Sequence, residues 1–133
     1  MDLKLDHYRK DGFVIIEHEG EIDVYTAPRA RELYIELVNR GEYRLILNLE
    51  RVEFLDSTGL GVMVGCLKRV RAHDGSVYLV CTQERILKIF RITDLNLNFP
   101  IFDTVDEAVT TSPEVIQDRL KVLRRNWAAR NRR

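Results

Sequence analysis

Hydrophobic and polar residues follow two periods along this chain, one typical of strands and one typical of helices. Residues 3–7 alternate between apolar and polar side chains, which predicts a half-buried first strand. Asp11-Gly12 is a turn signal of the hairpin kind. Residues 13–18 are rich in β-branched side chains and are predicted to form a second strand, which Glu19-Gly20-Glu21 interrupts.

A helical period follows this hairpin and returns three times later in the chain. Thr26 is expected to cap the first helix, Pro28 is tolerated in its first turn, and Gly41 suits its end. The apolar face of this helix is predicted to consist of Ala30, Leu33, Tyr34, Leu37 and Val38. Further helices are predicted to begin after Asp56, at Thr82 and at Thr104, and Thr104 with Glu107 has capping-box spacing.

Short apolar runs separate these helices. Residues 45–49 and 77–81 are predicted to be strands covered on both faces, and residues 99–102 an edge strand, because Pro100 is acceptable only at an edge. Alternating strands and helices after an opening hairpin predict an α/β sandwich. We expect a mixed, mainly parallel sheet of about 4–5 strands with about 4 helices, formed by residues 1–111.

A basic amphipathic helical tail, residues 112–133, is predicted after this domain. Its apolar stripe consists of Ile116, Leu120, Leu123 and Trp127. Residues 114–133 carry seven basic and two acidic residues, a net charge of +5, so the first 113 residues carry −5. Three roles stay open for the tail: it docks on the domain or on a second copy, it is a solvated helix, or it binds an acidic partner, a membrane or nucleic acid. No reading element accompanies its arginines, so direct DNA binding is not expected.

Composition excludes several classes of protein. No run of eighteen apolar residues exists, and the N-terminus has no apolar h-region, so we expect neither a membrane span nor a secretory signal, and a cytoplasmic location. Cys66 and Cys81 lie in apolar runs and are expected to be buried and reduced. His7, His18 and His73 have no ligand spacing with them, so neither a metal nor another cofactor is expected.

The segment from Asp56 to Gly61 carries the most distinctive chemistry. It places Ser57 and Thr58 where a strand ends and a helix begins, and a phosphate on Ser57 would be tolerated by the unpaired N–H groups there. Gly59 and Gly61 would let backbone or a partner surface approach closely. The alternative is that Ser57 is only a helix cap. Neither a nucleophile elbow nor a phosphate loop is present, and no catalytic base is placed beside Ser57, so we do not expect an enzyme.

Two motifs in order resemble the anti-sigma factor antagonists (anti-anti-sigma factors) of the STAS-domain class. The first is residues 21–28, EIDVYTAP, and the second is residues 54–61, FLDSTGLG. Residues 84–90, ERILKIF, are similar to the third helix of that family. The resemblance covers residues 1–111 and implies a STAS-like fold.

The resemblance also implies a partner-switching mechanism. Family members bind an anti-sigma factor that is also a serine kinase with a histidine-kinase-type ATP fold, and this binding releases a sigma factor to RNA polymerase. The kinase phosphorylates the antagonist and ends the interaction, and a serine phosphatase restores it. On this chain the phosphoacceptor would be Ser57, and the partner surface would consist of Asp23, Thr26, Asp56, Thr58, Gly59 and Leu60.

Two other functions remain open. A STAS module can bind a small ligand or a transporter complex without being phosphorylated. A hydrolase that uses Ser57 is the third candidate, although it lacks a placed base. Tyr25 is expected to be a packing residue rather than a contact.

Overall fold

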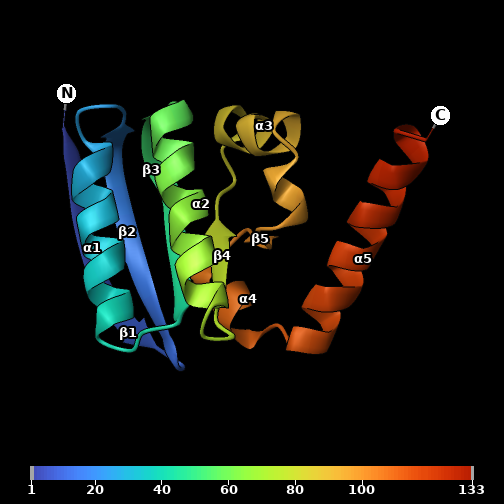
Figure 1. Ribbon diagram of the computed structural model, residues 1–133, viewed down its shortest axis with the longest axis horizontal. Coiled ribbons are helices and arrows are strands. Elements are labelled where there is room, and N and C mark those ends of the chain that lie inside the picture. Colours follow the sequence, from blue (N-terminus) through green and yellow to red (C-terminus); the bar gives the residue numbers. More distant parts are fainter. Residues whose placement is uncertain (1, 133) are drawn as a thin grey trace.

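Five strands form a single sheet in the order β1-β2-β3-β4-β5 in the computed structural model, which describes residues 2–132 (Figure 1). Strands β1 and β2 pair antiparallel, and each later neighbouring pair is parallel. The elements are β1 (Leu3–Lys10), β2 (Phe13–Ile22), α1 (Ala27–Asn39), β3 (Arg44–Leu55), α2 (Ser57–Arg71), β4 (Ser76–Val80), α3 (Glu84–Ile92), the short 3-10 helix η1 (Leu95–Leu97), β5 (Ile101–Phe102), α4 (Val105–Thr110) and α5 (Pro113–Arg130). Arg133, the end of the predicted tail, lies outside the described residues.

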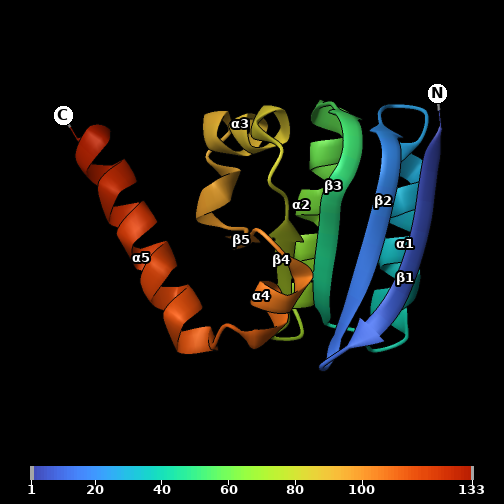
Figure 2. The same cartoon turned by 180° about the vertical axis from the view of Figure 1, so that it is seen from behind.

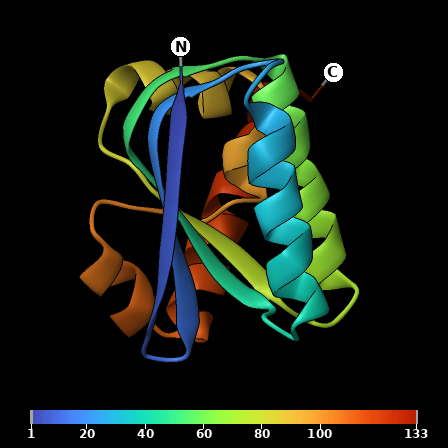
Figure 3. The ribbon, with the colours of Figure 1, turned by 90° about the vertical axis from the view of Figure 1, so that its left-hand side faces the viewer.

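Helices cover both faces of the sheet, as parallel pairing requires, because each crossover must return the chain to the same end. Helices α1 and α2 lie side by side on one face (Figure 3). Helix α4 and the first half of α5 pack against the other face, where Phe13 and Ile15 of β2 join their cluster, while most residues of β1 are exposed (Figure 2). The predicted α/β sandwich with a mixed, mainly parallel sheet is therefore confirmed.

The alternation of side chains along β3 divides the core in two. Leu45, Leu47 and Leu49 face α1 and α2, whereas Ile46 points to the opposite face. The first cluster takes in the predicted apolar face of α1, with Leu33 only partly buried. The second cluster consists of Phe13, Ile15, Ile46, Tyr78, Val80, Phe102, Ala108, Ile116 and Leu120.

Strand β2 does not stop at Glu19-Gly20-Glu21 as the sequence predicted. It continues to Ile22, and shifts of register against β3 absorb the irregularity. Gly20 has a φ of +112°, and a Cβ there would lie 2.2 Å from the carbonyl oxygen of Asp2. The glycine therefore lets β1 and β2 stay paired where any side chain would separate them.

The start of α3 also differs from the prediction. The helix begins at Glu84 rather than at Thr82, whose hydroxyl donates instead to the Glu50 carboxylate at 2.7 Å. The Gln83 amide donates to the carbonyl oxygens of Glu50 and Val52 at 2.7 and 2.9 Å. Pairing between β3 and β4 ends at Asn48, so the Gln83 amide satisfies backbone carbonyl groups on the edge of β3 that β4 no longer covers.

The tail forms helix α5, and its first half docks on the domain. Ser112 caps it, accepting from the Val115 N–H at 3.3 Å. Ile116 and Leu120 are 3% and 5% exposed within the second core cluster, whereas Leu123 and Trp127 are 38% and 36% exposed. The helix then leans away from the sheet (Figures 1 and 2). The division into a domain ending at 111 and a separate tail stays a prediction.

Helix α2 crosses the end of β2 at a glycine. A Cβ on Gly59 would lie 2.7 Å from both Ile22 Cγ2 and Leu55 Cδ1 and 3.0 Å from the Ile22 carbonyl oxygen. Gly61, in contrast, has nothing within 4 Å of its Cβ position, so the expected close approach occurs at Gly59 alone of the two.

His18 is buried between β2 and α1. One ring nitrogen, Nδ1, lies 3.1 Å from the Asn48 carbonyl oxygen, and Nε2 lies 2.5 Å from the Tyr34 hydroxyl. Burial lowers the pKa of His18 from 6.5 to about 4, so the imidazole is neutral in the folded protein at neutral pH.

We expect Gly59→Ala to destabilise the fold by about 1–3 kcal/mol, because the added methyl group must push α2 away from Ile22. Gly61→Ala is the matched control and should be up to about 1 kcal/mol more stable than the wild type, since alanine favours the helix and meets no neighbour. Urea unfolding midpoints measure both. Equal midpoints for the two variants would contradict the close approach.

The stability of the protein should fall as the pH falls from 6.5 to about 4. The unfolded chain protonates His18 in this range while the folded protein does not, so stabilisation present above pH 6.5 is lost, on the order of 3 kcal/mol by pH 4. His18→Gln should lack this component when unfolding is measured against pH, and His7→Gln, on the exposed part of β1, should retain it. A slope that His18→Gln leaves unchanged would refute the assignment.

Candidate partner-binding and phosphorylation site

The two sequence motifs meet at one edge of the sheet. Ile22 and Leu55 are register partners at the carboxyl ends of the parallel strands β2 and β3, so the residues that follow them emerge side by side. The Asp56 N–H donates to the Ile22 carbonyl oxygen at 3.2 Å and joins the two ends. The loop 23–26 and the start of α2 therefore form one surface, although about thirty residues separate them in the chain.

Asp23 organises the loop between β2 and α1. Its Oδ1 accepts hydrogen bonds from the backbone N–H groups of Tyr25 and Thr26 at 2.9 and 3.0 Å. These bonds favour the charged carboxylate, and the one from the Thr26 backbone is the largest cause of a lowered pKa for Asp23. Asp23 is thus an ionised, partly exposed group with a structural role in the same loop.

Thr26 has a different position from the one expected of a partner contact. It is 5% exposed, its Oγ1 accepts from the Asp23 N–H at 2.9 Å, and its hydroxyl donates to the Glu21 carbonyl oxygen at 2.7 Å. It precedes α1 as expected, but its side chain makes no capping bond to that helix. Thr26 therefore shapes the loop from inside and lies away from the accessible surface.

Asp56, and not Ser57, caps α2. The Asp56 carboxylate accepts from the Gly59 N–H at 3.0 Å, and its carbonyl oxygen accepts from the Leu60 N–H at 3.0 Å. Ser57 is the first helical residue and its side chain is exposed. The alternative that Ser57 is only a helix cap is wrong, because Asp56 is the capping residue and already accepts the hydrogen bond of the Gly59 N–H.

The remaining predicted site residues differ in accessibility. Thr58 is exposed, Asp56 and Leu60 are half-buried, and Gly59 is buried against Ile22. A partner approaching this edge can therefore touch Asp23, Asp56, Ser57, Thr58 and Leu60 directly. Gly59, like Thr26, positions the others.

Three apolar side chains of the two motifs are exposed, which the sequence pattern did not predict. Val24 is 55% exposed, Tyr25 86% and Phe54 48%. The expectation that Tyr25 is a packing residue is wrong, since its side chain is exposed and its backbone N–H, bonded to Asp23, holds it in the loop. The sequence did contain a signal for Val24 and Tyr25. They form an apolar pair between two polar residues after a strand, where neither the strand nor the helix periodicity assigns them to the core.

His18, His73 and the two cysteines lie away from this surface. His18 is enclosed by Asn48 and Tyr34, and His73 follows the far end of α2, where its ring stacks on Tyr43 at 4.1 Å between centroids. Cys66 and Cys81 are buried and free, as expected, and burial raises the pKa of Cys66 to about 12. Within residues 2–132, no three His, Cys, Asp or Glu side chains gather as metal ligands. No helix in that range is both long and apolar enough to span a membrane.

Comparison with known proteins matches this chain to one family. The family model for the STAS domain matches residues 4–108. The anti-sigma-B factor antagonist of Staphylococcus epidermidis is 37% identical over 95 residues, which are 71% of this chain and 88% of that protein.

Solved structures agree with this match. An anti-sigma factor antagonist from Mycobacterium paratuberculosis has a TM-score of 0.76 and 27% identity, and the match covers 82% of this chain and 92% of that one. The Bacillus cell fate determinant SpoIIAA in its phosphorylated form has a TM-score of 0.64 and 25% identity, covering 81% of this chain and 96% of that one. With the fold and both motifs in place, this chain belongs to the STAS-domain family of anti-sigma factor antagonists.

Proposed function

We propose that this protein is a phosphorylation-controlled antagonist of an anti-sigma factor. In its unmodified form it binds an anti-sigma factor that is also a serine kinase of histidine-kinase-type ATP fold, and a sigma factor is released to RNA polymerase. Phosphorylation of Ser57 by that kinase ends the interaction, and a serine phosphatase restores it. This role would place the protein in the cytoplasm.

The observation that carries the proposal is the exposed Ser57 at the first position of α2, next to a cap supplied by Asp56. The serine hydroxyl is accessible to a kinase without any loss of helix capping. The neighbouring loop 23–26 is fixed by its own hydrogen bonds, so a partner meets a preorganised surface. The relatives named antagonists of anti-sigma factors support the choice of partner.

A phosphate at this position would act mainly on the partner rather than on the fold. Phosphoserine carries about −1.5 to −2 charges at neutral pH. At about 6 Å from a partner carboxylate, an effective dielectric between about 20 and 80 gives roughly 1–5 kcal/mol of repulsion. The helix N-terminus returns only about 0.3–1 kcal/mol at an exposed site. Asp23 and Asp56 already make this edge acidic. A phosphate on Ser57 would add further negative charge there and so increase the repulsion of a carboxylate on the partner.

Exposed apolar side chains would supply most of the binding energy. Val24 and Tyr25 lie in the hydrogen-bonded loop, and Phe54 lies at the end of β3, three residues before Ser57. Aromatic anchors at the centre of an interface commonly dominate its affinity. We infer that the partner presents apolar pockets to these residues and keeps its charged groups near Ser57.

The chemistry of the switch belongs to the partner, and we propose that this chain is not itself an enzyme. The positions of His18 and His73, far from the α2 N-terminus, disfavour a hydrolase that uses Ser57. The other alternative, a STAS module that binds a small ligand or a transporter complex without phosphorylation, predicts no modification of Ser57.

Protein isolated from its native host should gain about 80 Da, one phosphate group, in intact-mass spectra. Peptide mapping should place the added mass on Ser57. The gain should vanish in Ser57→Ala and persist in Thr58→Ala, the matched control at the next exposed hydroxyl. Ser57→Asp should keep the wild-type unfolding midpoint and lose the kinase in a pull-down with the unmodified protein as reference. Absence of modification under every growth condition would favour the phosphorylation-free module.

Tyr25→Ala should weaken binding of the captured kinase at least tenfold without changing the unfolding free energy by more than about 0.5 kcal/mol, because the ring is 86% exposed. Tyr8→Ala is the control, since Tyr8 is 43% exposed and pairs with Ile15 near the opposite end of β2. Equal affinities of the two variants, measured by calorimetry, would show that the partner does not contact loop 23–26.

A further inference from the structure

A cavity of about 260 Å³ lies between α3, β5 and α5, and neither loop 23–26 nor the start of α2 contributes to its lining. Leu87 from α3, Phe102 from β5 and Leu120 from α5 belong to its three walls. Its complete lining is Leu87, Arg91, Asn96, Pro100, Ile101, Phe102, Ile116, Arg119, Leu120 and Leu123. Most of this surface is aliphatic or aromatic, which is typical of small-molecule sites.

The cavity exists because α5 docks through a narrow contact. Ile116 and Leu120 are buried, but a second cavity of about 240 Å³, which they also line, lies at Leu67, Tyr78 and Gln117. Beyond Leu120 the helix leans outward, so Leu123 stays 38% exposed. Protein interiors are normally close-packed, and apolar walls left apart forfeit dispersion contacts that an apolar occupant would restore.

The charged groups that line this space are arginines. Arg91 and Arg119 line the first cavity, Arg71 and Arg124 line the second, and no acidic side chain lines either among the described residues. Arg71 and Arg124 are engaged with the carbonyl oxygens of Asn98 and Leu97 at 3.5 and 3.1 Å. The first cavity therefore combines apolar walls with the guanidinium groups of Arg91 and Arg119. Among the described residues, neither group makes a hydrogen bond to a backbone carbonyl, unlike Arg71 and Arg124.

Both arginines of the first cavity have exchangeable partners. Arg91 pairs with Glu84, and Arg119 lies 3.8 Å from Glu107 Oε1. The two arginine side chains are 49% and 56% exposed, and exposed ion pairs of this kind contribute little to stability. A carboxylate entering the cavity can replace either acidic partner without leaving a buried charge unpaired.

We propose that this cavity binds an aliphatic carboxylate, with its chain against Leu87, Phe102 and Leu120 and its carboxylate between Arg91 and Arg119. Guanidinium groups form short, charge-assisted hydrogen bonds with carboxylates, and this sets the chemistry of the head group. A second copy of the chain is a poorer occupant. Its α5 carries five basic and two acidic residues, which two arginines would repel.

Decanoate is a suitable probe below its micelle-forming concentration. Calorimetry should show saturable binding of one molecule per chain, and decanol, which has the same chain without the charge, should bind at least tenfold more weakly. Trp127, the only tryptophan, lies one turn beyond Leu123 on α5 and supplies a fluorescence readout of the same titration. Bound decanoate should also raise the unfolding temperature, since it holds α5 against the sheet.

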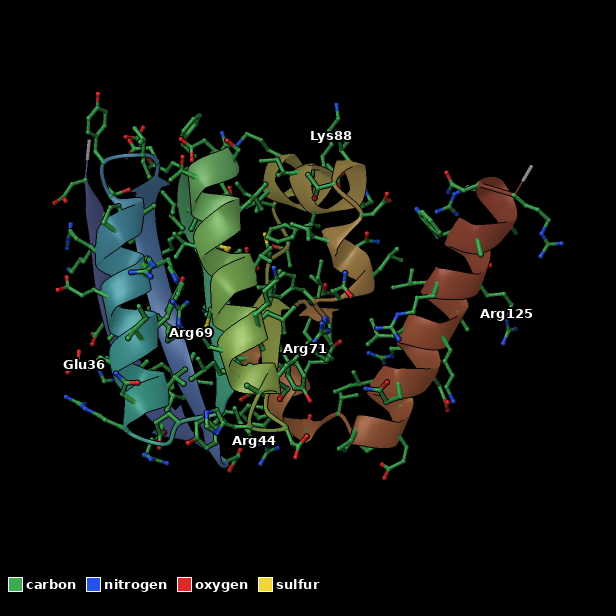
Figure 4. The ribbon with its side chains drawn as sticks, in the orientation of Figure 1. Glu36, Arg44, Arg69, Arg71, Lys88 and Arg125 are labelled. Atoms are coloured by element: carbon green, nitrogen blue, oxygen red, sulfur yellow. The ribbon has the colours of Figure 1, made fainter. Side chains whose placement is uncertain are left out.

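Two arginine variants separate a specific site from general attraction to a basic helix. Arg119→Gln should weaken decanoate binding about tenfold or more. Arg125→Gln removes the same charge from the same helix and should leave binding unchanged, because Arg125 lies on the side of α5 turned away from the sheet and α3 (Figure 4). Both substitutions lie on exposed positions, so both variants should fold.

The proposal would be overturned by the absence of saturable binding, by equal affinity for decanoate and decanol, or by equal losses in Arg119→Gln and Arg125→Gln. Sedimentation provides a further test. Concentration-dependent dimers that Leu123→Glu abolishes would show that a second copy occupies the cavity, which also contradicts the proposal. None of these outcomes depends on phosphorylation of Ser57, because the cavity and the α2 N-terminus have no lining residue in common.

Discussion

The parallel pairing of β2 with β3 is the constraint on which the rest of the molecule depends. It runs to the last residues of both strands, Ile22 and Leu55, in spite of register shifts on the way. The Asp56 N–H then binds the Ile22 carbonyl oxygen, and Gly59 brings α2 against the same residue. The direction of α2 and the position of Ser57 follow from this contact, because a helix that meets backbone at its first turn cannot pivot freely.

Neighbouring aspartates and threonines divide structural and exposed roles in the site. Asp56 caps α2, so the hydroxyl of Ser57 is not needed for capping. The side chains of Asp23 and Thr26 each accept a hydrogen bond from the backbone N–H of the other and hold the loop in place. Their hydrogen bonds keep apolar side chains such as Tyr25 in the solvent, where burial would otherwise be favoured. Acidic and apolar side chains thus lie close together on a rigid surface. Such a surface is suited to binding a protein partner whose affinity a single added charge can lower.

Helix α5 combines a docked first half with an exposed second half. Ile116 and Leu120 complete the core on the face that α4 covers only in part, and the helix then diverges from α3. The apolar space that remains is bounded by arginines and not by carboxylates. The basic charge of the tail, which in the sequence was compatible with several partners, thus acquires a specific location next to an apolar cavity.

Local patterns determined the sheet class, most helices and the two motifs, because periodicity and capping depend on residues a few positions apart. Thr104 and Ser112 cap their helices in agreement with that logic. The patterns failed where a partner distant in sequence decides the outcome. β2 continues past Glu19 because β1 and β3 pair with it, and Thr82 binds Glu50 instead of opening a helix. Likewise, the sequence singled out Ser57, Asp23 and Asp56, but only the tertiary structure decided which side chain caps, which is buried and which is exposed. Accessibility is a property of the packed elements around a residue and is not encoded in its immediate neighbours.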